Sequence, residues 1–142
     1  MNNKKFKPAS ILLVEDDDID AMSVQRAFKR MKIANPIVRA KDGIEALEIL
    51  LKGGVEQPYL ILLDLNMPRM GGLEFLDTIR NNPHLELSVV FVLTTSKDDE
   101  DKIKAYKNHV AGYIVKEKFD EGFEQLVQML DHYWRLVELP VV

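Results

Sequence analysis

The chain has 142 residues, of which 46% are hydrophobic and 30% charged, a composition typical of one globular domain with a sizeable core. Its net charge of −4 argues against a general nucleic-acid or membrane-surface binder, because such proteins need basic surfaces. The absence of cysteine excludes disulfides and thiolate metal sites and fits a reducing compartment.

Segments with strand and helix patterns alternate along the chain after residues 1–9, which we interpret as an N-terminal tail. Apolar runs predict strands at 10–14, 35–40, 59–64, 88–94 and 112–115. Apolar residues at helical spacing predict helices at 18–32, 43–51, 72–82, 96–108 and from Phe119 to Val137, with Ser96 capping the fourth. No apolar run is long enough for a signal peptide or a transmembrane span, so we expect a cytoplasmic protein.

Four of these strands are unbroken apolar runs, which is typical of a parallel sheet covered on both faces. We therefore expect an α/β fold in which residues 10–142 form one domain, with a five-stranded parallel sheet and helices on both faces. In such sheets the functional crevice lies outside the carboxyl ends of the strands.

Polar side chains stand where four of the predicted strands end. They are Glu15 to Asp18 after the first strand, Asp64 after the third, Thr94 to Ser96 at the end of the fourth and Lys116 after the fifth. The second strand ends in Arg39 to Lys41, which add nothing obvious. Carboxylates, hydroxyls and one ammonium are thus expected at one edge of the sheet.

Glu15, Asp16 and Asp64 would repel one another at this edge. At ~4 Å and an effective dielectric constant of ~20, each pair of like charges costs about 4 kcal/mol. A divalent cation would relieve this cost, and a donor set of oxygens alone favours Mg²⁺ before Ca²⁺. A metal, a carboxylate nucleophile, a hydroxyl and an ammonium together indicate phosphoryl transfer to a carboxylate, with Asp64 as the nucleophile.

Simpler interpretations exist for single residues. Any of Asp16 to Asp18 could be a helix N-cap, whereas Asp64 is separated from the next helix by the segment from Pro68 to Gly72. A calcium-binding loop counted from Asp16 fails, because its sixth and twelfth positions hold Ala21 and Ala27 in place of Gly and Glu. Thr94 could be a turn residue and Lys116 a solvated lysine, but suitable residues at all four strand ends are far less easily explained by coincidence.

At these residues the sequence resembles the receiver domain of two-component response regulators. The resemblance covers residues 10–137 and is carried by "ILLVEDD", "LILLDLNMPRMGG", "VLTTS" and "GYIVK", in this order. The separations of 30 residues from Asp64 to Thr94 and 22 from Thr94 to Lys116 are also those of compact receivers. The resemblance implies a flavodoxin-like fold with the strand order 2-1-3-4-5.

The family pattern also implies a role for each matching residue. Asp64 would be the phosphoacceptor and Asp16 a direct Mg²⁺ ligand, while Glu15 would act on the ion through water. The backbone carbonyl of Asn66 would complete the protein ligands.

Three further residues would respond to phosphorylation. Thr94 would move to hydrogen-bond the phosphoryl group, and Lys116 would pair with it. Tyr113 matches the aromatic residue that swings inward when the threonine moves, although a half-exposed strand aromatic is the alternative. Asn66 and Ser96 occupy positions that tune the lifetime of the acyl phosphate in receivers.

The sequence departs from the family pattern in two places. Receivers usually have proline after the lysine, but Glu117 and Lys118 follow Lys116 here. The usual Gly-Ala before the fifth strand is replaced by His109-Val110. A left-handed residue that ends the preceding helix would therefore fall on Asn108 or His109.

The resemblance implies a histidine kinase as partner. The C-terminal "YWRLVELP" and the "VLTTS" motif resemble the single-domain regulators that partner phytochrome-type histidine kinases, which tend to form twofold dimers. Only "VELPVV" follows the last helix, so we expect no DNA-binding domain, and readout by the surface of the receiver itself. We predict a homodimer through the face formed by the fourth helix, the fifth strand and the fifth helix; alternatively, the C-terminal tail folds back on its own core.

Three other functions are less consistent with the sequence. An aspartyl phosphatase or mutase needs a second acid two residues after the nucleophile, where Asn66 stands. A flavin or nucleotide carrier needs a Gly- or hydroxyl-rich loop after the first strand, where four acids stand and would repel a phosphate. A pseudo-receiver would lack a key position, and none is missing. We therefore expect a signalling module, not an enzyme, and we interpret His84, His109 and His132 as surface or packing residues.

Overall fold

The computed structural model of the protein describes residues 9–116 and 123–141. Its strands are β1 (Ser10–Val14), β2 (Ile37–Ala40), β3 (Tyr59–Leu63), β4 (Val89–Thr94) and β5 (Gly112–Val115). Its helices are α1 (Asp18–Arg30), α2 (Gly43–Leu51), α3 (Gly72–Arg80), α4 (Asp99–Lys107) and α5 (Glu124–Leu136). Among the residues described, no helix is long and apolar enough to cross a membrane.

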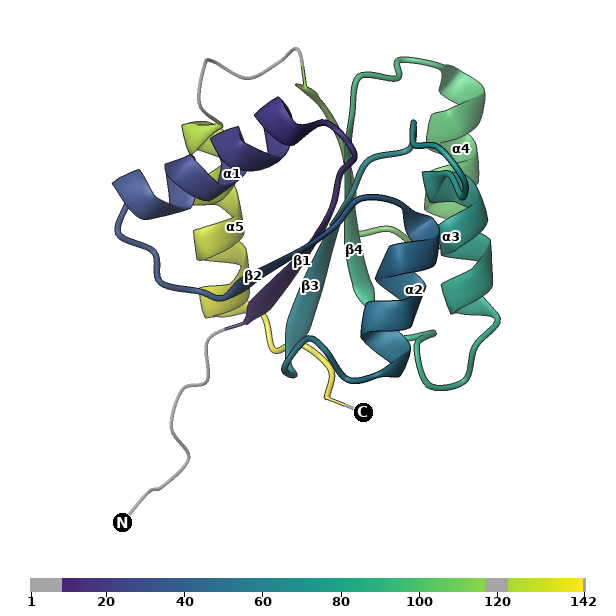
Figure 1. Ribbon diagram of the computed structural model, residues 1–142, viewed down its shortest axis with the longest axis horizontal. Helices are drawn as coiled ribbons and strands as arrows, with labels where there is room; N and C mark the ends of the chain where they lie inside the picture. Colours follow the sequence, from purple (N-terminus) through teal and green to yellow (C-terminus); the bar gives the residue numbers. More distant parts are fainter. Residues whose placement is uncertain (1–8, 117–122, 142) are drawn as a thin grey trace.

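The strands form one parallel sheet in the order β2-β1-β3-β4-β5, which confirms the predicted topology. Helices α1 and α5 cover one face of the sheet, and α2, α3 and α4 cover the other (Figure 1). The register decides which strand ends meet. Val14 pairs with Leu63, so the residues that follow them, Glu15 and Asp64, leave the sheet side by side.

Each face of the sheet packs into its own apolar core, because consecutive strand residues point to opposite sides. On the side of α1 and α5, Leu13 and Leu62 pack with residues of both helices, and Phe28 stacks on Trp134 with ring centroids 6.1 Å apart. On the other side, Leu63 packs with Phe75 of α3, among others. Burial on both faces explains why the strand sequences are apolar without alternation.

Aspartates cap three of the helices. The Asp17, Asp42 and Asp98 side chains accept hydrogen bonds from backbone N–H groups in the first turns of α1, α2 and α4. The prediction that Ser96 caps the fourth helix was wrong. Ser96 Oγ instead donates to Asp101 Oδ2 at 2.7 Å, so it braces the loop before the helix.

Helices α1 and α4 end in residues with left-handed backbone geometry. After α1, Lys32 has φ 58°, which explains why the helix is shorter than its apolar pattern. After α4, His109 has φ 61°, so the predicted left-handed residue at Asn108 or His109 is His109.

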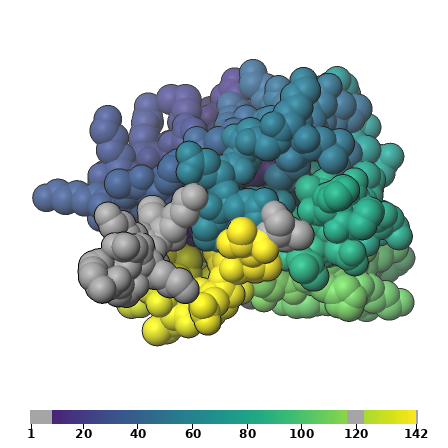
Figure 2. Space-filling view, turned by 90° about the horizontal axis from the view of Figure 1, so that it is seen from below, coloured from purple at the N-terminus to yellow at the C-terminus, as the bar shows by residue number. Residues whose placement is uncertain are grey.

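At the C-terminal end of the chain, helix α5 begins at Glu124, and the predicted helix start at Phe119 lies outside the described residues. After α5, Leu139 packs against the core between the sheet, α1 and α5. The C-terminal segment crosses the amino end of the sheet, as the view from below shows (Figure 2). Part of the tail thus folds back on its own core, the alternative considered for it.

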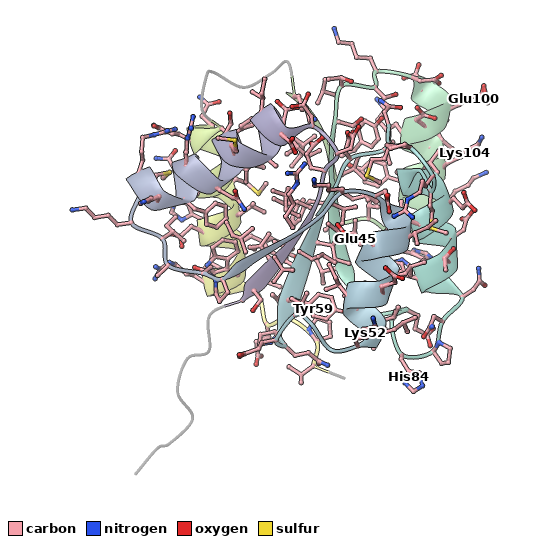
Figure 3. The ribbon with its side chains drawn as sticks, viewed as in Figure 1. Glu45, Lys52, Tyr59, His84, Glu100 and Lys104 are labelled. Carbon is pink, nitrogen blue, oxygen red and sulfur yellow. The ribbon has the colours of Figure 1, made fainter. Side chains whose placement is uncertain are left out.

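The three histidines are all exposed, in agreement with their interpretation as surface residues. His84 projects from the loop after α3, at the amino end of the sheet and far from the carboxyl edge (Figure 3). His109 and His132 lie on the loop after α4 and on α5.

Candidate phosphoryl-transfer site

Three carboxylates gather at the carboxyl edge of the sheet. Glu15, Asp16 and Asp64 each offer an oxygen atom within 4.8 Å of those of the other two. Glu15 and Asp64 are buried, 2% and 6% exposed, whereas Asp16 is exposed. The pairing of β1 with β3 therefore produces the acidic cluster expected from the strand ends.

Lys116 supplies a positive charge next to these carboxylates. It follows β5, and its side chain is 9% exposed. Its Nζ donates to Glu15 Oε1 at 2.8 Å and to Asp20 Oδ2 at 2.7 Å. Asp64 Oδ2 lies 3.8 Å away, near enough for attraction but too far for a hydrogen bond.

One lysine does not neutralise this number of acids. Burial raises the pKa of Glu15 to about 7, and the charge of Asp64 adds to this rise while the hydrogen bond from Lys116 opposes it. Burial lowers the pKa of Lys116, but hydrogen bonds to Asp20 and Glu15 outweigh burial and raise it above its usual value. The lysine therefore stays charged, whereas burial, with a smaller contribution from the charge of Asp64, makes the ionised form of Glu15 less favourable.

Thr94 and Tyr113 are linked through one residue of the loop between β4 and α4. Thr94 is fully buried, and its Oγ1 accepts a hydrogen bond from the Ser96 N–H at 3.3 Å. The Tyr113 hydroxyl donates to the Ser96 carbonyl at 3.0 Å. Burial raises the pKa of Tyr113, so its hydroxyl keeps the proton that it donates. A displacement of Thr94 would therefore act on a peptide segment that Tyr113 also holds.

The loop after β3 packs back against the phosphoacceptor position. A Cβ atom added to Gly72 would lie 2.6 Å from the Asp64 carbonyl oxygen, so only glycine fits there. Arg69, with φ 60°, bonds Asp42 through its Nε at 2.7 Å. The Asn66 N–H donates to Asp64 Oδ1 at 3.3 Å. Of these contacts, the one from Asn66 reaches the Asp64 side chain directly, and the role of the Asn66 carbonyl as a metal ligand stays a prediction.

Two residues near this cluster were not predicted from the sequence. Asp20, in the first turn of α1, bonds Lys116 as described above. Arg39, at the end of β2, donates from Nε and Nη2 to the Glu15 carbonyl at 3.0 and 2.9 Å, and its Nη1 pairs with Asp18 at 2.7 Å. The strand order 2-1-3-4-5 was a signal for Arg39, because it places the end of β2 beside the end of β1.

The donor set fits a hard divalent cation. All three candidate ligands are carboxylates, and oxygen donors are those that Mg²⁺ and similar ions prefer. Such a cation would also balance the negative charge of Asp64, which adds to the rise in the pKa of Glu15 that burial causes.

The strand order and the acids at the carboxyl edge together define a flavodoxin-like α/β protein whose acidic cluster at that edge is suited to a divalent cation. The response regulator receiver domain family matches residues 11–131. The chain belongs to this family, whose members are signalling proteins. The predicted resemblance is thereby confirmed.

Several relatives resemble the whole chain. Response regulator Rcp1 of Synechocystis sp. is 37% identical over 145 residues, which cover 99% of each protein. The probable methanogenesis regulatory protein FilR2 of Methanothrix harundinacea is 39% identical over 130 residues, which cover 89% of this chain and 84% of FilR2.

Two crystal structures of such regulators are also similar. The Mn²⁺-bound form of Rcp1 matches with a TM-score of 0.83 at 37% identity, over 94% of this chain and 100% of that one. The phosphorylated cyanobacterial phytochrome response regulator RcpA matches with a TM-score of 0.84 at 33% identity, over 95% and 100%. These matches confirm the resemblance to phytochrome-type single-domain response regulators.

Proposed function

We propose that this protein is a single-domain response regulator that accepts a phosphoryl group on Asp64 from a histidine kinase, in a reaction that depends on Mg²⁺. The observation that carries the proposal is the cluster of Glu15, Asp16 and Asp64 with Lys116 beside it. In the reaction, a carboxylate oxygen of Asp64 would attack the phosphorus atom, and the bond from phosphorus to the histidine nitrogen would break.

Each residue of the site would have its own role in this reaction. Glu15, Asp16, Asp64 and the Asn66 carbonyl would hold Mg²⁺, which when bound would balance the charge of the phosphoryl oxygens. Lys116 would supply a second positive charge to these oxygens, and Thr94 a hydroxyl hydrogen bond. The buried positions of Glu15, Asp64 and Thr94 support these roles, because electrostatic interactions are stronger away from water.

The kinase is proposed to be of the phytochrome type. Support comes from the similarity to RcpA, which is described as a phytochrome response regulator, over 95% of this chain. Histidine kinases take their phosphoryl group from ATP, so the proposed reaction would take place in the cytoplasm.

The signal would pass to a partner through the surface of the receiver, with a homodimer formed by the face of α4, β5 and α5. Helix α4 supports this assignment because Ile103 and Tyr106, one helical turn apart, are 53% and 50% exposed. Glu100 and Lys104 project outward from the same helix (Figure 3). Light scattering with and without beryllofluoride tests the dimer, and a monomer under both conditions would refute it.

The phosphoacceptor is tested with a small-molecule donor. The protein is incubated with acetyl phosphate and Mg²⁺ and its intact mass is measured. We expect one phosphoryl adduct on the wild type and none on Asp64→Asn, which keeps the shape of the side chain but loses the nucleophilic carboxylate. No adduct on the wild type would refute the proposal.

A further inference from the structure

Asp20 holds the lysine of the site from outside the acidic cluster. It lies in the first turn of α1, and its Oδ2 is 2.7 Å from Lys116 Nζ, across 96 residues of sequence. Its side chain is 30% exposed, so the contact is partly shielded from water. Asp20 is outside the group of acids placed to hold a divalent cation.

Two hydrogen bonds define the orientation of the Lys116 ammonium group. Lys116 has three N–H donors, and within the described part of the chain two of them go to Glu15 and Asp20. The next carboxylate oxygen, Asp64 Oδ2, is 3.8 Å away. Two fixed bonds at a tetrahedral nitrogen restrict the direction of the third N–H, which remains for an oxygen placed on Asp64.

We propose that Asp20 is a positioning residue, which holds the Lys116 ammonium beside Asp64 when the charge of Glu15 is engaged by a divalent cation. This inference rests on the proposed function. A cation bound by Glu15 would weaken the hold of Glu15 on the lysine and would repel the ammonium. Asp20 is the one described partner of Lys116 that the cation leaves untouched, so it keeps the second positive charge at the site.

We expect the fold to tolerate the removal of this carboxylate. Helix α1 is capped by Asp17, whose Oδ1 accepts a hydrogen bond from the backbone N–H of Asp20. The side chain of Asp20 takes no part in this cap. Alanine is the best helix former. Asp20→Ala therefore removes the contact with Lys116 and leaves the cap in place.

The test compares Asp20→Ala with Asp18→Ala. Asp18 is an acid of the same helical turn, but its side chain is 70% exposed and pairs with Arg39 instead. The measured quantity is the rate of adduct formation on Asp64 with acetyl phosphate at saturating Mg²⁺. We expect the rate to fall about tenfold in Asp20→Ala, which corresponds to one charge-assisted hydrogen bond, and to change less than about twofold in Asp18→Ala. Asp20→Glu, which keeps the carboxylate, should recover most of the rate.

Two readouts separate positioning from a general effect on the fold. In a double-mutant cycle, Asp20→Ala should have almost no further effect on the rate in a Lys116→Met background, because its partner is gone. In the metal-free protein, the side-chain ammonium signal of Lys116 should be visible by NMR in the wild type and broadened by exchange with water in Asp20→Ala.

The outcomes are distinct. If the wild type forms no adduct on Asp64, the proposed function fails. If the wild type and Asp18→Ala react and Asp20→Ala reacts equally fast, only the positioning role fails. Additive effects of Asp20→Ala and Lys116→Met would overturn it as well.

Discussion

The Lys116 ammonium and the Asp64 carboxylate lie 3.8 Å apart, so they attract each other without forming a hydrogen bond. The ammonium is held instead by Glu15 and Asp20. A phosphoryl group on Asp64 would bring further oxygens toward this nitrogen. In the unphosphorylated protein, Lys116 is therefore placed so that it could form a hydrogen bond with a phosphoryl group on Asp64.

Removal of the lysine should strengthen cation binding. Lys116 Nζ lies 2.8 Å from Glu15 Oε1 and competes with a divalent ion for that carboxylate. We expect Lys116→Met to lower the dissociation constant for Mg²⁺ about tenfold, measured by calorimetric titration, since the interaction of charges at this distance amounts to more than 1 kcal/mol. Lys102→Met, which removes an exposed lysine of α4, serves as the control. An unchanged affinity in Lys116→Met would show that the lysine and the cation do not share Glu15.

The effect of pH on stability should depend on Mg²⁺. The pKa of Glu15 is raised from 4.5 to about 7, so the folded protein binds a proton more tightly than the unfolded chain does. In the metal-free protein this group therefore lowers the free energy of unfolding as the pH rises from the unfolded to the folded pKa. The loss is up to about 3 kcal/mol across that range.

A divalent cation would bind the ionised form of Glu15 and offset this loss. Urea denaturation at about pH 5 and about pH 7.5, with and without excess Mg²⁺, measures the effect. Stabilisation by Mg²⁺ should be larger at the higher pH, and Glu15→Gln should flatten the metal-free profile. A pH profile that is the same in the wild type and in Glu15→Gln would contradict the assignment.

Most of the fold was predictable because it depends on local patterns. The strand at 112–115 and the helix at 43–51 have the predicted bounds, since apolar runs and Gly53, with φ 70°, mark them. The residue that caps α4 was not predictable, because two candidate capping residues stand close together. Ser96 and Asp98 can both accept backbone hydrogen bonds, and the tertiary contacts of the loop decide between them.

The site was predictable to the extent that it follows from strand ends. Glu15 and Asp64 are brought together by the register of neighbouring strands, which the family pattern implies. Asp20 was not predictable from this rule, because it lies within helix α1 and its partner Lys116 follows β5, 96 residues further along the chain. Its contact depends on where α1 sits over the sheet, and the sequence pattern does not specify that.

Thr94 is expected to link phosphorylation to Tyr113. Thr94→Ala removes the hydroxyl that accepts from the Ser96 N–H, while leaving Asp64 and the acidic cluster unchanged. We expect the variant to form the phosphoryl adduct but to lose the change in the Tyr113 ring environment, followed by NMR of labelled tyrosine on addition of beryllofluoride. Thr95→Ala, at the exposed neighbouring residue, is the control. A full tyrosine response in Thr94→Ala would rule out this link.

Arg80 should contribute more to the stability of the fold than Arg135 does. Its guanidinium donates to the carbonyls of Asn108, Glu86 and Ser88 at 2.7 Å each, and so joins α3 to the loop before β4 and to the end of α4. Arg80→Met should lower the free energy of unfolding by about 2–4 kcal/mol, because partly buried carbonyls lose their donor. Arg135→Met, in an exposed pair on α5, should cost about 0.5 kcal/mol or less. Equal denaturation midpoints for the two variants would contradict this role.

Asp64 itself is expected to carry the phosphoryl group. Borohydride reduces an acyl phosphate to an alcohol, so it marks the modified carboxylate permanently. The wild type and Asp64→Asn are treated with acetyl phosphate and Mg²⁺, reduced, digested and mapped by mass spectrometry. We expect Asp64 alone to be converted in the wild type and no acidic residue to be converted in Asp64→Asn. Conversion of Glu15 or Asp16, or of no residue in the wild type, would contradict it.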